Sequence, residues 1–108
     1  MAVTSEIVKD EKKLRIAVSG RFDFGMHQAF RETYEKVSRS DFECVEVDLR
    51  DANYLDSSAL GMLLLLRDYA GGDHAKIKII NICADVEKIL AISNFDKLFE
   101  LEKPPVER

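Results

Sequence analysis

Several features that would assign a protein class at once are scarce in this chain of 108 residues. Its 16 basic residues are outnumbered by 20 acidic ones, and this net charge of -4 argues against nucleic acid or an anionic membrane as the main partner. The longest apolar stretch, Ala59 to Leu66, is short and is interrupted by Gly61, so we expect no direct membrane insertion. The N-terminus has neither the basic start nor the apolar run of a secretion signal, and we expect a cytoplasmic protein.

Cysteine and proline are also rare. Cys44 and Cys83 each fall within or at the end of a strand-like run, which favours reduced thiols packed in a core over a disulfide framework. With 46% apolar residues, a chain of this length can bury one hydrophobic core but hardly two. We therefore expect a single domain over residues 1–102, followed by a polar C-terminal tail over residues 103–108 that starts at Lys103, Pro104 and Pro105.

Hydrophobic periodicity divides the chain into strand-like and helix-like segments. In chain order, the pattern predicts strands around 7–8 and 14–18, a helix over 26–38, a strand over 45–49, a loop over 50–55, a helix over 57–70, a strand over 76–82, a helix after Asp85 and a short element over 95–101. Gly71 and Gly72 are expected to stop the second helix, Asp85 to act as N-cap of the third, and Asn94 to end the third in a left-handed conformation.

This order predicts an α/β fold with a mixed sheet. The first two strands form an antiparallel hairpin, and the later strands, which are joined through helices, should be parallel with right-handed crossovers. Parallel strands covered on both faces usually read as unbroken apolar runs, whereas three strands here alternate apolar with polar residues. We therefore expect the helices mainly on one face of the sheet.

The junction D-S-S-A-L-G, Asp56 to Gly61, lies where a strand gives way to the apolar helical run. It places two hydroxyls at a helix N-terminus, where exposed N–H groups and the helix dipole favour negative charge, so a phosphoryl group would be tolerated there. The same residues are also what an N-cap requires. From the residues alone, Ser57 is therefore either a helix cap or a phosphoacceptor, and Ser58 is a capping or hydrogen-bonding hydroxyl.

The second predicted helix carries more apolar surface than a small core needs. Its first two turns offer little polar surface, and an excess apolar flank in a domain of this size suits a partner protein. Gly61 lies four residues after Ser57 on the same helix face. Its missing side chain either permits the close approach of a partner or relieves crowding against the domain's own sheet.

No arrangement typical of an enzyme or a cofactor site is present. His27 and His74 lie in no recognisable catalytic or metal-binding spacing, and no G-x-S-x-G elbow surrounds Ser57. Asp48, Asp51 and Asp56 show no fixed ligand spacing, and the chain has no glycine-rich phosphate loop. We expect a protein that is not an enzyme and that needs no metal or other cofactor.

A longer segment resembles a known family. V-D-L-R-D-A-N-Y-L-D-S-S-A-L-G-M-L-L, Val47 to Leu64, resembles the signature of STAS domains, particularly of bacterial anti-sigma factor antagonists. Gly20 to Asp23, G-R-F-D, resembles the family's glycine-to-aspartate turn, and Val86 to Phe99 resembles its third helix. Ala59 and Asn94 stand where glycine is common in the family. Both departures are mild, because alanine is the better helix former and asparagine tolerates the left-handed conformation.

The resemblance implies a STAS-like domain that controls transcription by partner switching. Ser57 corresponds to the family's phosphoacceptor. The resemblance places Asp23 on the same edge of the domain as this serine, where it either contacts the partner or its kinase, or caps a turn. The implied partner-binding residues are Asp23, Asp56, Ser57, Ser58 and Gly61. The unphosphorylated form would bind an anti-sigma factor, often itself a serine kinase, and a serine phosphatase would restore it after phosphorylation. The alternative is a STAS interaction subunit of a transport or signalling complex without a phosphorylation cycle.

Overall fold

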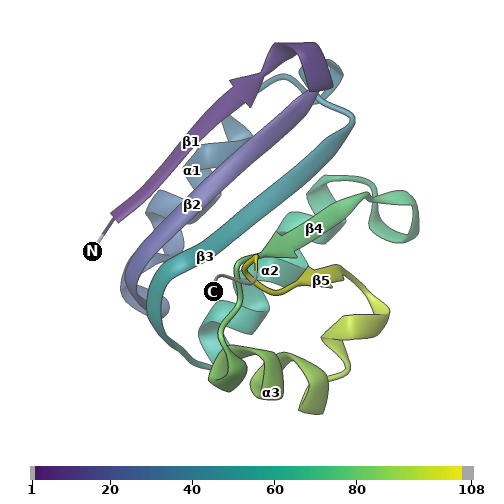
Figure 1. Cartoon of the computed structure of the whole chain (residues 1–108). Helices are drawn as coiled ribbons and strands as arrows, with labels where there is room; N and C mark the ends of the chain where they lie inside the picture. Colours follow the sequence, from purple (N-terminus) through teal and green to yellow (C-terminus); the bar gives the residue numbers. More distant parts are fainter. Residues whose placement is uncertain (1, 106–108) are drawn as a thin grey trace.

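The computed structural model describes residues 2–105, which form a five-stranded sheet and three α-helices (Figure 1). The strands are β1 (Ala2–Val8), β2 (Lys13–Phe22), β3 (Cys44–Leu55), β4 (Ile77–Ile80) and β5 (Glu100–Glu102). The helices are α1 (His27–Glu35), α2 (Ser57–Tyr69) and α3 (Ala84–Ile92). No helix within this part of the chain has both the length and the apolar composition needed to cross a membrane.

The strands lie side by side in the order in which the chain makes them, β1-β2-β3-β4-β5. β1 and β2 are antiparallel, and each later strand is parallel to its predecessor after a crossover that contains one helix. Because successive right-handed crossovers step in the same direction, they place their helices on the same face of the sheet. Figure 1 shows α1 and α2 behind the sheet and α3 at its lower end. Together with the strand pairing, this confirms a mixed sheet with helices mainly on one face.

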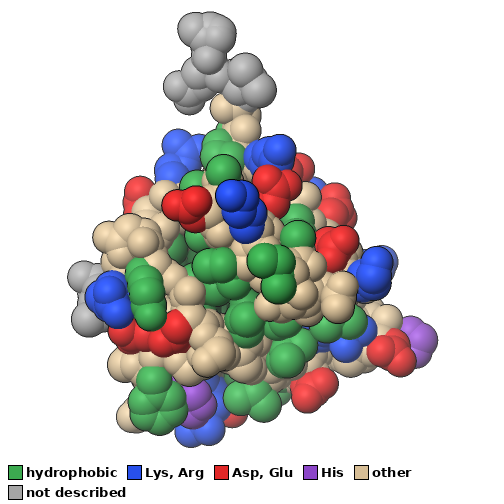
Figure 2. All heavy atoms as spheres, turned by 90° about the horizontal axis from the view of Figure 1, so that it is seen from below, with side chains coloured by type: hydrophobic (Ala, Val, Ile, Leu, Met, Phe, Trp, Pro, Cys, Tyr) green, Lys and Arg blue, Asp and Glu red, His purple; other side chains and the backbone are tan. Residues whose placement is uncertain are grey.

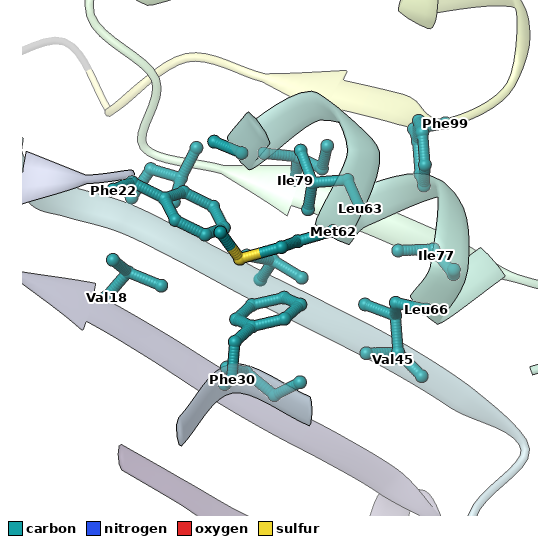
Figure 3. Close-up of a cluster of buried hydrophobic side chains, with 14 of the residues drawn as sticks. Val18, Phe22, Phe30, Val45, Met62, Leu63, Leu66, Ile77, Ile79 and Phe99 are labelled. Carbon is teal, nitrogen blue, oxygen red and sulfur yellow. The ribbon is translucent and has the colours of Figure 1, made fainter. Parts of the chain in front are cut away.

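The hydrophobic core fills the space between that face and the helices. Leu14, Ile16 and Val18 of β2 are at most 1% exposed and alternate with half-buried residues, as the sequence pattern predicts. Figure 3 shows side chains of α2 meeting residues of α1 and of the strands. The labelled residues there are Val18, Phe22, Phe30, Val45, Met62, Leu63, Leu66, Ile77, Ile79 and Phe99. This layer explains why each strand needs only one apolar side.

Within residues 2–105, no helix covers the opposite face of the sheet, which carries paired charges. Glu46 of β3 accepts a hydrogen bond from Arg15 Nε at 2.8 Å and one from Lys13 Nζ at 3.3 Å. Lys78 Nζ of β4 lies 3.7 Å from Glu100 Oε2 of β5. A buried carboxylate such as Glu46 requires such partners, because an unpaired charge there loses its hydration without compensation. These pairs account for the polar half of the alternating strand pattern.

The loop expected over residues 50–55 is wrong, because β3 continues as a strand to Leu55. Its second half pairs with the end of β2, with Asp51 opposite Ser19 and Leu55 opposite Phe22. Two register shifts between β2 and β3, one between Ala17 and Ser19 and one between Gly20 and Arg21, accompany this pairing, and β3 supplies the extra residue each time. Backbone hydrogen bonds to a distant strand thus override the turn-forming character of residues such as Asp51.

Several element ends also differ from the sequence expectations. The first helix follows a 3-10 turn at Phe24–Met26 and ends at Glu35, before the expected Ser38. β4 is shorter than the expected 76–82, because the chain turns at Asn81 with a φ of 59°. The short C-terminal element includes β5, a fifth strand absent from the predicted order, because three residues are too few to show a period.

The start of α3 and the cysteines require corrections as well. α3 begins at Ala84 with Cys83 at its N-cap position, so Asp85 lies inside the first turn, where its charge still suits the helix dipole. Cys83 is exposed and Cys44 is only half-buried on the open sheet face, so neither packs in the core, although both are free thiols. Asn94, in contrast, has the expected left-handed backbone, with a φ of 62°. The predicted tail begins with irregular residues 103–105, and residues 106–108 lie outside the described part of the chain.

Candidate functional site

The site forms where β2 and β3 end beside each other. Phe22 and Leu55 are the last residues of these two parallel strands and are paired in register. Asp23 and Asp56 follow them directly, so the sheet brings together two carboxylates that are 33 residues apart in the chain. Ser57 then begins α2. The parallel register is therefore what places Asp23 on the same rim as the two serines.

Asp56 caps α2. Its Oδ1 accepts a hydrogen bond from the Ala59 N–H at 3.1 Å and one from the Ser58 hydroxyl at 2.6 Å. The pKa of the Asp56 carboxyl is lowered mainly by the Ser58 hydrogen bond, and partial desolvation opposes this. The backbone N–H groups of Ala59 and Ser58 and the charge of Arg21 lower the pKa further. The cap therefore belongs to Asp56, and the alternative in which Ser57 is the cap is wrong.

Ser57 remains exposed at the first position of α2. Among residues 2–105, no group hydrogen-bonds to its hydroxyl, whereas the neighbouring Ser58 hydroxyl is half-buried and already donates to Asp56. The hydroxyls of Ser57 and Ser58 thus differ in exposure and in hydrogen bonding. Ser57 is the hydroxyl that a modifying enzyme can reach.

Asp23 has a local structural role. Its Oδ1 accepts the Gly25 N–H at 3.0 Å and so caps the 3-10 turn Phe24–Met26. Its Oδ2 accepts a hydrogen bond from Arg21 Nε at 3.3 Å, so one carboxylate oxygen faces a cation at the surface. Turn capping is therefore present, and it leaves the second oxygen on the rim of the site.

Arg21 and Tyr54 are site residues that the sequence reasoning did not select. They are paired across β2 and β3, and the Arg21 guanidinium carbon lies 3.8 Å from the centroid of the Tyr54 ring. Both side chains are exposed. Each lies within a segment that resembles the family, but only the register of the extended strands brings them together. The sequence of either segment alone therefore does not show that Arg21 and Tyr54 are in contact.

α2 continues the site as an exposed stripe, which we call the α2 stripe, formed by Ser57, Gly61, Leu64, Leu65 and Asp68. These positions share one helix face, and Leu64 and Leu65 are 38% and 48% exposed. A Cβ added at Gly61 would meet no atom within 4 Å. The reading in which Gly61 relieves crowding against the domain's own sheet is therefore wrong, and the excess apolar flank expected from the sequence is present.

The end of the molecule that carries the site has further apolar surface. Figure 2 views the molecule from the lower end of Figure 1 and shows hydrophobic side chains grouped among charged ones. Phe24, next to Asp23, is 71% exposed and stacks on the ring of His27, and Ile92 at the end of α3 is 82% exposed. Within residues 2–105, no group of three or more His, Cys, Asp or Glu side chains could hold a metal ion. The site therefore presents the exposed hydroxyl of Ser57 beside an apolar surface.

Comparison with known proteins gives the family. The family model described as "Mlab, STAS domain" matches residues 5–102. The chain belongs to the STAS domain family. A STAS-domain containing protein from Pseudomonas aeruginosa (strain UCBPP-PA14) is 56% identical over 101 residues, which cover 94% of this chain and 99% of that protein.

Solved structures share the fold at low sequence identity. A protein from Thermotoga maritima is 14% identical with a TM-score of 0.79 and covers 94% of this chain and 86% of its own. The anti-sigma factor antagonist SpoIIAA in its unphosphorylated form is 13% identical with a TM-score of 0.72, over 97% and 90% of the two chains. An anti-sigma factor antagonist from Mycobacterium paratuberculosis is 18% identical with a TM-score of 0.76, over 97% and 88%. These similarities establish the fold.

Proposed function

We propose that this protein is a cytoplasmic anti-sigma factor antagonist whose docking is switched off by phosphorylation of Ser57. One observation carries the proposal: the exposed Ser57 hydroxyl, free of hydrogen bonds within residues 2–105, stands at the head of the α2 stripe. The unphosphorylated form binds an anti-sigma factor or serine kinase through this surface, and a serine phosphatase restores the form that binds. The protein acts by binding, and catalysis belongs to its partners.

The physical basis of the switch is a change of charge in the centre of an apolar docking surface. Phosphorylation adds about -1.5 to -2 charges and three acceptor oxygens to Ser57. Burying that charge against a partner without a counter-charge costs several kcal/mol, so binding weakens strongly. Within residues 2–105, Ser57 neither packs in the core nor caps α2, so we expect its modification to leave the fold intact. The remaining rim residues, Asp23, Asp56, Ser58 and Gly61, contribute shape and charge to the docking surface.

The modification site is tested by intact-mass analysis of protein purified from its native cells. The wild-type chain and Ser58→Ala are expected to carry one phosphate in part of the population, and Ser57→Ala none. Ser58→Ala is the matched control, because it removes the neighbouring hydroxyl and leaves Ser57 in place. Phosphate that persists in Ser57→Ala rejects the site.

The charge dependence of docking is tested by pull-down with three variants at one position. Ser57→Ala and Ser57→Asn should recover the same partner as unmodified protein, whereas Ser57→Asp should recover at least tenfold less. Asparagine matches aspartate in size, so this pair isolates the charge. Equal recovery by the Asn and Asp variants contradicts charge-controlled docking.

A second candidate is a STAS interaction subunit of a transport or signalling complex, without a phosphorylation cycle. The observation that favours it is the exposure of Leu64 and Leu65, which offers an apolar surface whatever the state of Ser57. This candidate predicts no phosphate on the native wild-type protein and equal partner recovery by all Ser57 variants. The two experiments above therefore separate the candidates.

A further inference from the structure

An arginine, Arg21, lies among the acidic groups of the site. Arg21 Nε donates to Asp23 Oδ2 at 3.3 Å, and the guanidinium carbon lies 3.8 Å from the centroid of the Tyr54 ring. The Arg21 side chain is 57% exposed. Because it is exposed, the guanidinium can exchange partners without leaving an unpaired charge in the core.

The strand register places Arg21 within the neighbourhood of Ser57. Arg21 is paired with Tyr54, and Ser57 follows Tyr54 by three residues, immediately after β3 ends. The electrostatic effect of Arg21 on Asp56, the residue before Ser57, points the same way. Hydrogen bonds from Ser58 and the backbone lower the pKa of Asp56, and Arg21 is the cation among the described residues that lowers it further.

The partners that hold Arg21 are weaker than a phosphate would be. Asp23 supplies one carboxylate charge through a 3.3 Å contact, and its other oxygen is engaged with the Gly25 N–H. Phosphoserine carries about -1.5 to -2 charges, and arginine binds phosphate oxygens through two parallel hydrogen bonds. We propose that Arg21 is the counter-ion of phosphorylated Ser57 and that it leaves Asp23 and the Tyr54 ring to reach the phosphate. This proposal rests on the proposed function, because it takes Ser57 as the phosphoacceptor.

The exchange changes more of the docking surface than the serine alone. When Arg21 turns to the phosphate, the Tyr54 ring loses its cation cover and Asp23 loses its ion pair. The rim then presents Asp23 as an unpaired carboxylate beside the modified serine. Phosphorylation thus alters the partner-facing surface on both β2 and β3.

The test is a 31P NMR titration of the full chain with phosphoserine installed at position 57 by genetic encoding. A nearby cation favours the doubly charged phosphate and lowers its second pKa, which is about 6 without such a partner. We expect Arg21→Gln to raise this pKa by about half a pH unit at low ionic strength, and Arg21→Lys to keep part of the wild-type shift. The difference should shrink in high salt.

Arg67→Gln is the matched control, because it removes the same charge from the far end of α2. Arg67 lies ten residues after Ser57, which is about 15 Å along the helix. Equal titration of the wild type and Arg21→Gln overturns the proposal, as does an equally large shift in Arg67→Gln.

A second measurement uses the unmutated arginine. The Nε–H resonance of Arg21 should move when unmodified and phosphorylated chains are compared, and an unmoved resonance also overturns the proposal. Because the phosphoserine is installed directly, both results are obtained even if cells never phosphorylate Ser57. Failure of the proposed function and failure of this inference are therefore distinguishable.

Discussion

The two flanks of α2 are both rich in apolar residues, yet they differ in what covers them. Ala59, Met62, Leu63 and Leu66 face the sheet and are at most 3% exposed. Leu64 and Leu65, between the last two of these, are 38% and 48% exposed on the α2 stripe. The adjacent residues Leu63 and Leu64 thus differ in burial. One flank is buried and stabilises the fold, and the other is exposed to solvent.

The largest difference between the flanks should appear in stability. Leu63→Ala removes a fully buried side chain and should lower the free energy of unfolding by about 3 kcal/mol. Leu64→Ala, the matched change at the adjacent exposed position, should cost less than about 1 kcal/mol. Urea denaturation of both variants measures these values. Equal losses would show that the two flanks contribute alike to the fold.

Binding should show the opposite pattern. The double change Leu64→Ala and Leu65→Ala, made in the Ser57→Ala background, should weaken capture of the partner by about tenfold or more, because the few residues that dominate an interface lie near its centre and cost over about 1 kcal/mol each when truncated. Leu98→Ala is the control, since Leu98 is 37% exposed but lies between α3 and β5, where it borders a pocket with Cys44 and Glu46 of the open sheet face. Affinity is measured by titration with the captured partner. An equal loss in the control would remove the α2 stripe from the docking surface.

Gly61 allows a smaller change within the exposed flank. Because an added Cβ meets no atom within 4 Å, Gly61→Ala should raise the free energy of unfolding by about 0.5–1 kcal/mol through better helix propensity. The same methyl group should weaken partner binding if the partner approaches the helix backbone closely. Urea denaturation and partner titration measure the two effects. A loss of stability would place Gly61 in the domain's own packing.

The smallest expected effect on stability concerns Asp56, which caps the N-terminus of α2, where both flanks begin. The lowered pKa of Asp56, caused first by the Ser58 hydrogen bond, means that its charged form stabilises the folded state above the unfolded pKa of about 3.9. That contribution is lost as the pH falls through the folded pKa. Asp56→Asn keeps an oxygen to accept the Ala59 N–H but does not titrate. The stability difference between wild type and variant should therefore be constant above about pH 5 and should shrink below about pH 4, as measured by urea unfolding at each pH.

Much of the fold was predictable because its signals are local. The strands near Leu14 and Val45 alternate cleanly, and the apolar run after Asp56 has a strong capping residue at its start. The extension of β3 through residues 50–55 was not predictable, since Asp51 and Asn53 favour turns and their strand conformation depends on pairing with β2. β5 was missed for the same reason, because β4 alone makes it a strand.

The candidate site shows the same division. The sequence by itself determined that two serines follow an aspartate at the start of an apolar helix, because capping and periodicity act between residues close in the chain. Only the tertiary structure decided that Asp56 is the cap and that Ser57 stays exposed. Only the tertiary structure decided which leucines of α2 remain exposed, since a helix that is apolar on nearly every side does not indicate which flank meets the sheet. Tertiary structure also decided that Arg21 lies beside Tyr54 and Asp23. That arrangement depends on a register set by backbone hydrogen bonds between distant strands.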